Sequence, residues 1–461
     1  MFLALPVVSA LLGIGAFSAL PYAWVLALAW LVPLFLFFQR ECRLVRLLIG
    51  TALFRIIFAA GVVYFAAEPF GWMASILLFL GLPVSFHLVR RFVGARAAAI
   101  SLPFLWTFWD LLEARYTFLP VYVMAQGNAL AVSPFLGLAR WGGIAGLTLF
   151  GAVVNAVLTG GIITLFKRER HLWIGAIVLL LVAGFSASRW VLHQNGAAYQ
   201  SRPRELRVAA VSTDAVFDSA LNFPYDILSP SERQIAAEHL AAMLEPLRHE
   251  LRRQPLDLVL LPEDMIDLES WHDADPEALA AFGIESGGVL IAAYRRLAAD
   301  LAVDVSATFT TIQRGERYNT TLLFSRDGAL AGRANKVRLA IGGEYWPFGR
   351  WRPFYWNWAG RIRPEISAES PIFDPQYQYA AGEPHLLHTG GFSFASPICA
   401  EVHYPWDIRA AVQEGAQFVV HTGNNSWVAL GRGQYLRLTD GVRRTEEVWL
   451  NVPIVLSGKA E

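Results

Sequence analysis

The sequence is poor in cysteine and in charge. Only Cys42 and Cys399 occur among 461 residues, and charged residues make up 16% of the chain, against roughly 25% in ordinary globular domains. Two cysteines exclude a disulfide scaffold and a four-cysteine metal site. The 38 basic and 38 acidic residues give a formal net charge of zero. This excludes a protein that binds nucleic acid through bulk positive charge, so we expect no nucleic-acid partner.

Apolar residues are in excess, and they are concentrated in the first part of the chain. Hydrophobic residues make up 55% of the sequence, and the mean hydropathy is +0.40. A membrane-spanning helix needs about 20 mostly apolar residues, so residues 1–192 are predicted to form a polytopic α-helical membrane domain of about seven spans. Buried helices of a large soluble protein are the alternative, but several uncharged runs exceed about 18 residues. The expected spans are Phe2–Leu20, Tyr22–Phe38, Leu44–Ala66, Trp72–Val89, Ala97–Leu112, Leu138–Phe166 and Leu172–Val191.

Basic residues in the connecting loops predict the orientation of these spans. They gather after the second, fourth and sixth spans, and such clusters stay on the cytoplasmic side. The N-terminus is therefore expected in the cytoplasm, and residues 203–461 on the periplasmic side of a bacterial inner membrane. The first run lacks a basic n-region and contains Pro6, so we expect a retained helix rather than a cleaved signal peptide. The clusters are Arg40, Arg43 and Arg46; Arg90, Arg91 and Arg96; and Lys167, Arg168 and Arg170.

Residues 203–461 have the patterns of a layered domain outside the lipid. Short β-rich runs alternate with helical patterns, which is typical of an α/β or α+β domain. A length of about 260 residues is enough for one domain with a substantial core. The expected strands are Leu206–Val211, Leu256–Leu261, Val303–Thr311, Thr320–Phe324, Phe392–Ile398, Gln417–Thr422 and Pro453–Leu456. The expected helices are Ser231–Arg253, Gly288–Leu301 and Tyr404–Glu414.

The first candidate site follows a buried-strand pattern. The run Asp257–Glu263 reads Asp-Leu-Val-Leu-Leu-Pro-Glu and ends in a carboxylate. Catalytic groups of α/β domains lie at such strand ends, and partial desolvation raises a carboxyl pKa towards values useful to a general base. Glu263 is therefore a candidate base. A surface or helix-capping glutamate is the alternative.

The second candidate site combines a lysine with a turn that contains two glycines. Lys336 ends the stretch Arg333–Lys336 after a predicted strand hairpin, and Gly342–Pro347 reads Gly-Gly-Glu-Tyr-Trp-Pro. Such a lysine is commonly a solvated surface residue, but beside a nucleophile its ammonium stabilises a tetrahedral oxyanion. The glycine pair permits a close backbone approach and positions a second carboxylate, Glu344.

The third candidate site contains the one cysteine outside the predicted membrane part. Cys399 lies at a predicted strand-to-helix turn in the stretch Phe392–Glu401, which also supplies Glu401. Helix-terminal amides are expected to lower the thiol pKa and to donate to an oxyanion. An inert buried cysteine is one alternative, and a Cys–His pair with His403 or His421 is another.

Together the three sites resemble those of a known family. Pro-Glu263, Asn-Lys336 and Ile-Cys399-Ala-Glu401 occur in the order of the nitrilase superfamily, whose triad is Glu-Lys-Cys. This resemblance implies that residues 203–461 form an α+β nitrilase-like domain, a four-layer α-β-β-α sandwich. Four further stretches look like the membrane-embedded apolipoprotein N-acyltransferase family, namely Gly15–Trp24, Trp106–Arg115, Gly343–Pro347 and Asn424–Trp427.

The resemblance implies a role for each site residue. Glu263 takes the proton of Cys399, the thiolate attacks the ester of a phospholipid to form a thioester, and Lys336 stabilises the oxyanion. Glu344 and Glu401 support and orient the site. The amine of the diacylglyceryl-cysteine of an apolipoprotein then takes the acyl chain. The implied partners are a phospholipid donor, a diacylglyceryl apolipoprotein acceptor and membrane lipids, and we expect no cofactor and no metal.

A group of tryptophans and arginines near the second site is expected to contact lipid. Aromatic rings anchor at the membrane interface, and arginines pair with phosphate headgroups. An aromatic-rich loop packed on the domain is the alternative. The residues are Trp346, Trp351, Trp356 and Trp358 with Arg350, Arg352, Arg361 and Arg363, and Trp427 is added as a further lipid or substrate contact.

The sequence departs from the family pattern in two main places. Ala400 stands where the family usually has tyrosine directly after the nucleophile. The sequence ends at Glu461, where family members continue with further strands and a transmembrane helix, so those elements are expected to be lacking. Since the triad is present, we expect catalysis. Two other functions stay open: a membrane-anchored nitrilase-type amidase or acyltransferase for another amine, and an inactive binding or scaffolding protein.

Overall fold

The computed structural model describes most of the chain. The described residues are 3–62, 75–116, 124–164, 170–200, 205–211, 244–263, 288–341, 343–346, 348–349, 351, 378–424 and 432–459. Their contacts divide the chain into two compact units. The first unit is Met1–Arg202 with Val428–Asn451, and the second unit is Pro203–Trp427 with Val452–Glu461.

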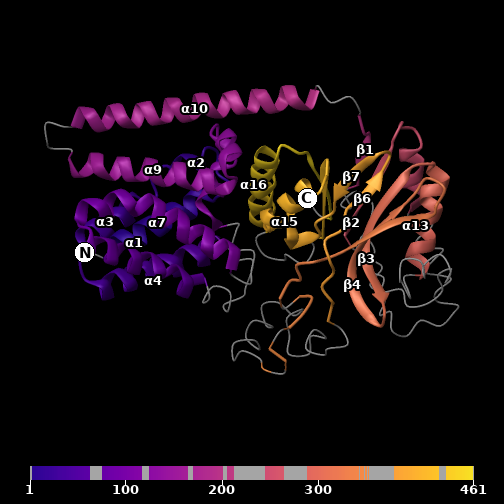
Figure 1. Cartoon of the computed structure of the whole chain (residues 1–461), viewed down its shortest axis with the longest axis horizontal. Coiled ribbons are helices and arrows are strands. Elements are labelled where there is room, and N and C mark those ends of the chain that lie inside the picture. The colour runs from indigo at the N-terminus through magenta and orange to yellow at the C-terminus, as the bar shows by residue number, and fades with distance from the viewer. Residues whose placement is uncertain are drawn as a thin grey trace. The chain divides into compact units, whose positions relative to one another are not determined.

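The first unit is helical throughout its described part (Figure 1). Its central core is aromatic: Trp30 packs on Phe58 with ring centroids 4.8 Å apart and edge-on against Trp106 at 5.8 Å. Such contacts fix the helices by shape, because lipid provides no hydrophobic driving force between them. The helices are α1 (Ala4–Ala16), α2 (Trp24–Ala27), α3 (Val32–Arg40), α4 (Leu44–Val62), α6 (Gly81–Phe92), α7 (Ala95–Tyr116), α8 (Gln126–Leu130), η3 (Leu136–Trp141), α9 (Ile144–Ile163), α10 (Arg170–Gln200) and α16 (Arg432–Leu450).

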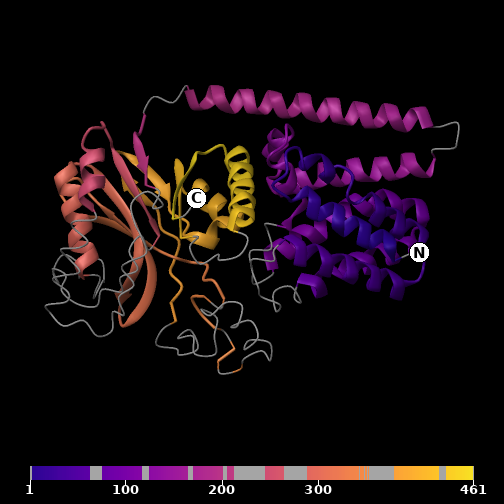
Figure 2. The same cartoon turned by 180° about the vertical axis from the view of Figure 1, so that it is seen from behind.

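Four helical stretches among the described residues are long and apolar enough to cross a membrane. They include α10, which lies alongside α9 in both views and continues past the predicted domain boundary to Gln200 (Figures 1 and 2). The first two expected spans correspond to shorter apolar helices, and the fifth corresponds to α7. The four stretches are Leu44–Val62, Ser75–Phe92, Ile144–Ile163 and His171–Gly196.

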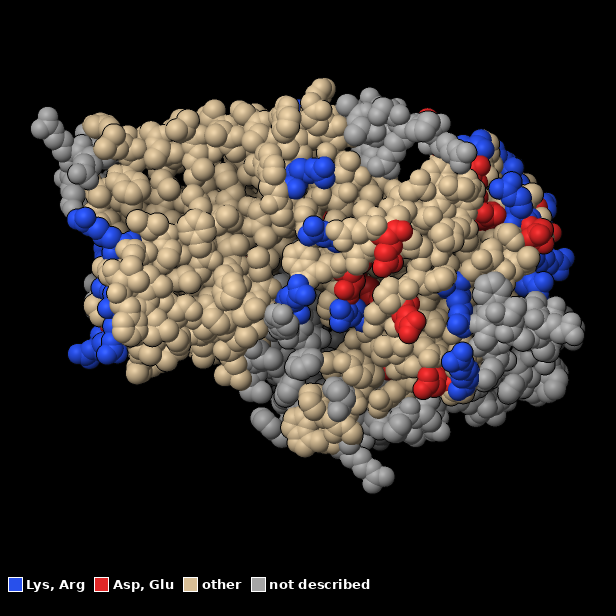
Figure 3. Space-filling model, viewed as in Figure 1, with Lys and Arg blue, Asp and Glu red and all other residues tan. Residues whose placement is uncertain are grey.

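Two of the basic clusters lie side by side in the first unit. The guanidinium of Arg90, near the end of α6, donates to the carbonyl oxygens of Phe38, Gln39 and Glu41 at 2.9–3.3 Å. The loops after the second and fourth expected spans therefore meet at the same end of the helices. In the view of Figure 3, basic side chains lie at one end of this unit, and most of its length carries no charged side chain.

Helix α16 is the main difference from the predicted organisation. It is distant from the other helices of the first unit in sequence, yet Tyr435, Leu438 and Val442 join that unit's apolar core. Gln434 Nε2 also donates to the carbonyl of Phe17, so both apolar and polar contacts hold the helix. The sequence patterns did not predict this helix.

The second unit contains two sheets in its described part. One has the order β1-β2-β3-β4-β5, with β1, β2 and β3 parallel and the last two pairings antiparallel. The other has the order β6-β7-β8-β9, with β7, β8 and β9 parallel. The strands are β1 (Val208–Ala210), β2 (Leu258–Glu263), β3 (Asp304–Gln313), β4 (Glu316–Phe324), β5 (Leu330–Asn335), β6 (Leu387–Thr389), β7 (Phe392–Ala395), β8 (Phe418–Asn424) and β9 (Ile454–Lys459). Strands β5 and β6 were not among the expected β-rich runs.

The sheets pack face to face with helices outside, which confirms the predicted four-layer sandwich (Figure 1). Alternation along β2 produces this layering. Val259 and Leu261 pack towards α13 (Gly288–Leu301), while Leu258 and Leu260 join Phe394 and Val420 of the second sheet in the layer between the sheets. Helix α15 (Pro405–Gln413) packs beside β7 of the second sheet.

Candidate active site

Glu263 is placed by an irregularity at the end of β2. Pro262 cannot donate to the ladder, and the pairing register of β2 on β3 shifts between Leu260 and Glu263. The shifted carboxylate is buried and accepts two hydrogen bonds. Asn319 Nδ2 donates to Oε1 at 2.7 Å, and the backbone N–H of Asn424 donates to Oε2 at 2.9 Å. These contacts join the base candidate to both sheets.

Lys336 follows β5 and is only 1% exposed. Its Nζ lies 2.8 Å from Glu344 Oε1 and 3.9 Å from Glu263 Oε1. Burial by itself lowers the Lys336 pKa, but the neighbouring acidic groups Glu344, Cys399 and Glu263 outweigh burial and raise that pKa well above its ordinary value. The side chain is therefore an ammonium held between carboxylates.

Glu344 is fixed by three donors. Its Oε1 accepts from Lys336 Nζ and from Asn319 Nδ2 at 3.0 Å, and its Oε2 accepts from the backbone N–H of Ala340 at 2.7 Å. Glu344 thus brings a second carboxylate to the lysine.

Cys399 opens the short 3₁₀ helix η9 (Cys399–His403) after β7. Its backbone has a φ of +52°, in the left-handed region that is uncommon for a residue with a side chain. The thiol is half-buried, and the backbone N–H of Ala400 acts on it to lower the Cys399 pKa. The charges of Glu263, Lys336 and Glu344 all act on the sulfur. The structure therefore brings together Glu263, Lys336 and Cys399, the three residues proposed from sequence.

The expectation that the Cys399 thiol has a lowered pKa is wrong. Burial first, and the Glu263 charge second, raise the Cys399 pKa, and the lowering effects of Lys336 and the Ala400 N–H are smaller. The sequence pattern suggested helix-terminal amides but could not show how deeply the sulfur is enclosed. Burial likewise raises the pKa of Glu263, as predicted, with Lys336 and Asn319 opposing it. A protonated thiol beside a carboxyl of raised pKa is an arrangement suited to general-base activation.

Glu401 connects the lysine segment to the nucleophile turn. Its Oε1 accepts from the backbone N–H groups of Val337 and Arg338 at 2.7 and 2.8 Å, and its Oε2 accepts from that of Ile398 at 2.8 Å. Burial raises the Glu401 pKa to about 7, against the opposing charge of Lys336 and these N–H donors. Its contacts fit the supporting role expected for it.

The two histidines kept as alternatives lie near the nucleophile. His421 Nε2 lies 2.9 Å from the carbonyl oxygen of Cys399, and a carbonyl can only accept, so Nε2 carries the proton. His403 is buried in η9, and burial together with His421 lowers its pKa to about 3. This geometry engages the proton of His421 with the backbone and does not present it as the base for the thiol.

Asn319 is a site residue that the sequence patterns did not single out. Asn319 lies on β4, opposite Thr310 of β3, and bridges two carboxylates that are distant in sequence. Its backbone carbonyl also accepts from the Lys336 N–H at 2.8 Å. A polar residue inside a run of otherwise apolar and threonine positions was the available signal.

The tryptophans expected to contact lipid divide in the structure. Trp346 is 4% exposed, packs with Ile341 and donates through Nε1 to the carbonyl of Trp351. Lipid contact by the Trp346 ring is therefore wrong, because the ring is in a local core. Trp351 is 53% exposed. Trp356, Trp358 and Trp427, with Arg350, Arg352, Arg361 and Arg363, lie outside the described residues.

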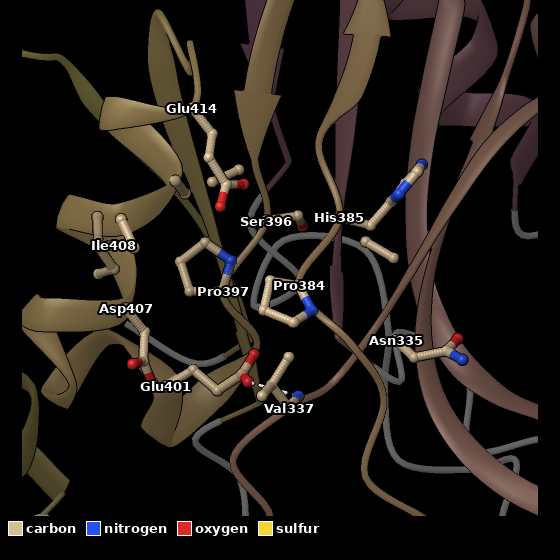
Figure 4. A pocket seen from close by; sticks show the side chains of 14 residues that line it. Asn335, Val337, Pro384, His385, Ser396, Pro397, Glu401, Asp407, Ile408 and Glu414 are labelled. Carbon is tan, nitrogen blue, oxygen red and sulfur yellow. Dashed lines mark hydrogen bonds between the residues drawn. The ribbon is translucent and has the colours of Figure 1, made fainter.

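A cavity of about 130 Å³ lies beside the nucleophile turn (Figure 4). Figure 4 shows Glu401 at its edge, reaching towards Val337, with Pro397 and Ile408 on its walls. Glu263, Lys336 and Cys399 are not among the described residues that line it. The cavity therefore adjoins the support of the site and not the reacting groups.

No group of three or more metal-ligating side chains occurs in the part of the chain that the structure describes. Cys42 is exposed between α3 and α4, and Arg90 Nη2 lies 3.2 Å from its sulfur.

The chain is similar in sequence to proteins of known families. Residues 227–444 match the family model for carbon-nitrogen hydrolases. An apolipoprotein N-acyltransferase of Aquifex aeolicus is 24% identical over 359 residues, covering 76% of this chain and 69% of the relative. One of Chlorobaculum tepidum is 23% identical over 460 residues, covering 94% of this chain and 80% of the relative.

Solved structures also match part of the chain. A carbon-nitrogen hydrolase of Helicobacter pylori is 16% identical with a TM-score of 0.34, covering 50% of this chain and 69% of that one. Nit3 of Saccharomyces cerevisiae is 17% identical with a TM-score of 0.34, covering 55% of this chain and 76% of that one. In sequence, the chain is therefore similar to carbon-nitrogen hydrolases over residues 227–444, and the resemblance to the apolipoprotein N-acyltransferases is confirmed over most of its length.

Proposed function

We propose that this chain is an N-acyltransferase that moves a fatty acyl chain from a phospholipid to the N-terminal amine of the diacylglyceryl-cysteine of an apolipoprotein. The buried cluster of Glu263, Lys336 and Cys399 carries the proposal, since it combines a base, an oxyanion partner and a nucleophile. The names of the similar curated proteins and the membrane-length helices support the choice of lipid substrates.

The first step forms a thioester on Cys399. The Glu263 carboxylate takes the thiol proton as the sulfur attacks the ester carbonyl of the phospholipid, and the Lys336 ammonium stabilises the oxyanion that develops. Collapse of the tetrahedral intermediate breaks the bond between the carbonyl carbon and the glycerol oxygen. Glu263 returns its proton to that oxygen, and a lysophospholipid leaves.

The second step passes the acyl group to the amine. The amine attacks the thioester carbonyl, the carbon–sulfur bond breaks, and Glu263 transfers one amine proton to the departing sulfur. The amide product and the free thiol of Cys399 result, so no net charge or electron is gained or lost. A thioester keeps the acyl group activated between the two half-reactions without a nucleotide cofactor.

The second unit is proposed to lie on the periplasmic side of a bacterial inner membrane, which the chain crosses several times. The basic loops after α3 and α6 support this assignment, since they meet at one end of the helices and such loops stay in the cytoplasm. The diacylglyceryl acceptor and the phospholipid donor are then both available from the outer leaflet. Trp351 is the described side chain proposed to contact lipid.

Labelling of the intact protein tests the function. The full chain in detergent is incubated with phospholipid that carries a radiolabelled acyl chain, and label on the protein is measured before and after hydroxylamine. We expect hydroxylamine-sensitive label that is lost in Cys399→Ala and retained in Cys42→Ser, the matched control at the exposed cysteine. Label that persists in Cys399→Ala contradicts the thioester.

Adding an acceptor then separates acyl transfer from hydrolysis. A synthetic diacylglyceryl peptide with a free amine should remove the label and become N-acylated. The same peptide with an acetylated amine is the control, and it should leave the label on Cys399. Equal loss of label with both peptides, with release of free fatty acid, would identify a hydrolase instead.

A further inference from the structure

We infer that His421 is a positioning residue for the nucleophile: its imidazole holds the carbonyl of Cys399 so that the N–H of the same peptide group points at the reacting sulfur. This inference deepens the proposed function and rests on it for the identity of the reaction. The geometry itself concerns only the thiol turn.

The contact that carries the inference joins a buried side chain to a backbone atom. His421 lies on β8 and is 4% exposed, and its Nε2 lies 2.9 Å from the Cys399 oxygen. Since the carbonyl offers only lone pairs, the imidazole is a donor at Nε2. The peptide group that contains this carbonyl also contains the Ala400 N–H, which acts on the Cys399 thiol to lower its pKa.

In the peptide group between Cys399 and Ala400, the oxygen is therefore held by His421, and the N–H is directed at the sulfur. A hydrogen bond accepted by a carbonyl polarises the amide and strengthens its N–H as a donor, because chains of hydrogen bonds act cooperatively. It also fixes the direction of that N–H. In an attack by sulfur on an ester, a donor beside the sulfur lies near the developing oxyanion.

The backbone of the nucleophile needs such support. Cys399 has a φ of +52°, and non-glycine residues in this region persist only where their surroundings hold them. On the upstream side, the Thr422 N–H donates to the Pro397 carbonyl at 3.3 Å, and Ile398 pairs with Thr422 in a parallel bridge. His421 supplies the matching contact on the downstream side, so adjacent residues of β8 hold the turn from both ends.

The same strand also reaches the base. The Asn424 N–H of β8 donates to Glu263 Oε2 at 2.9 Å. One strand thus sets the relative positions of the peptide that follows the nucleophile and of the carboxylate that takes its proton. Among the described residues, the charges of Glu263, Lys336 and Glu344 act on the sulfur. His403 is an ionisable neighbour of His421, and its pKa is lowered to about 3, so it is neutral under working conditions.

The test measures the reactivity of Cys399 without any lipid. In the full chain with Cys42→Ser, the rate of alkylation by iodoacetamide is compared for wild-type, His421→Leu and His421→Gln. Leucine removes the donor, and glutamine can place its Nε2 near the position of the imidazole Nε2. We expect alkylation at fixed pH to fall about tenfold in His421→Leu, the equivalent of one pKa unit, and to recover within about threefold in His421→Gln.

Two further variants keep the result decisive. Val420→Ala weakens the neighbouring core position of β8, and it should lower the melting temperature without changing the alkylation rate. Should His421→Leu fail to fold, His421→Asn replaces it, since its shorter amide cannot reach the carbonyl. Three results would each overturn the inference. The variant that lacks the donor, His421→Leu or His421→Asn, could be alkylated at the wild-type rate, or His421→Gln or Val420→Ala could be alkylated as slowly as that variant.

Acylation by phospholipid then links the inference to the reaction. In His421→Leu the rate constant for thioester formation should fall, while the phospholipid concentration that gives half the maximal rate stays unchanged. If no variant accepts label from phospholipid but the alkylation pattern holds, the proposed function fails and the role of His421 stands. If wild-type is acylated by phospholipid and His421→Leu is alkylated and acylated at the wild-type rates, the proposed function stands and the role of His421 fails.

Discussion

The side-chain amide of Asn319 donates to Glu263 Oε1 at 2.7 Å, and this bond is one of two that bring the carboxylate of β2 into the site. The same nitrogen donates to Glu344 at 3.0 Å, so a single NH₂ group separates two carboxylates that would otherwise repel each other. The backbone carbonyl of Asn319 meanwhile holds the Lys336 N–H. The arrangement of base and ammonium is therefore set from β4.

Replacing Asn319 with leucine should shift the pH dependence of acylation upwards. The bond from Asn319 lowers the Glu263 pKa, so its loss raises that pKa further. A base with a higher pKa stays protonated to a higher pH, and the rising limb of the rate-against-pH profile moves in the same direction. Thioester formation measured across pH gives the limb. Asn335→Leu, on the neighbouring strand, removes an asparagine bonded to Gln313 and should leave the limb in place.

Glu263→Gln should separate chemical reactivity of the thiol from enzymatic acylation. The Glu263 charge raises the Cys399 pKa, so its removal makes the thiol more acidic and should speed alkylation by iodoacetamide. Acylation by phospholipid should nonetheless fall by about 10²–10⁴-fold, because the proton acceptor is gone. Both rates are measured on the same protein in the Cys42→Ser background.

Glu414 is exposed, so Glu414→Gln is the control for removal of one negative charge. Neither the alkylation rate nor the acylation rate should change in this variant. A Glu263→Gln variant that loses alkylation and acylation equally would point to a collapsed site. One that keeps wild-type acylation would remove Glu263 from the role of base.

The strand ends with candidate catalytic residues were predictable from the sequence, because each has a local strand pattern followed by a reactive side chain. The apolar run before Glu263 and the turn after Phe394 were predicted from composition and local pattern, and both appear in the structure. The contacts of Asn319 and His421 were not predictable, since they depend on the register of β4 and on which strand lies beside the nucleophile. The thiol pKa was misjudged for a related reason: enclosure by both sheets is a tertiary property.

Helix α16 shows a different limit of sequence patterns. Its 19 residues include Gly433 and Gly441 and are rich in charge, so the segment has a weak helical signal and no resemblance to a membrane span. Packing of Leu438, Val442 and Val448 onto the core of the first unit stabilises it. Tertiary contacts of this kind outweigh intrinsic propensity.

Glu401 should make the fold less stable as pH rises from about 4.5 to 7. Its carboxyl keeps its proton in the folded chain up to about pH 7 but loses it near 4.5 when unfolded. The folded state binds more protons in this window, so stability present below pH 4.5 is lost as pH rises, by about 3 kcal/mol for this shift. Glu401→Gln has no such titration. The decrease in melting temperature from pH 5 to pH 8 should therefore be larger in wild-type than in Glu401→Gln. An equal decrease in both proteins would contradict the raised pKa of Glu401.

Trp351 and Trp346 form a matched pair for the question of lipid contact. Trp351 is 53% exposed and touches Phe348 edge-on, whereas Trp346 is 4% exposed and packs in the cluster with Ile341. Trp351→Ala should lower acyl transfer from phospholipid vesicles several-fold while the melting temperature stays close to wild-type, because an exposed ring contributes to interface binding and little to the fold. Trp346→Ala should instead destabilise the second unit by about 3 kcal/mol or more, as truncation of a buried tryptophan does. Activity on a short-chain phospholipid below its critical micelle concentration separates the two effects, since this assay needs no membrane surface. Trp351→Ala should match wild-type in that assay. An equal loss of activity on monomers and on vesicles would place this ring in the fold or the active site and not at the lipid interface.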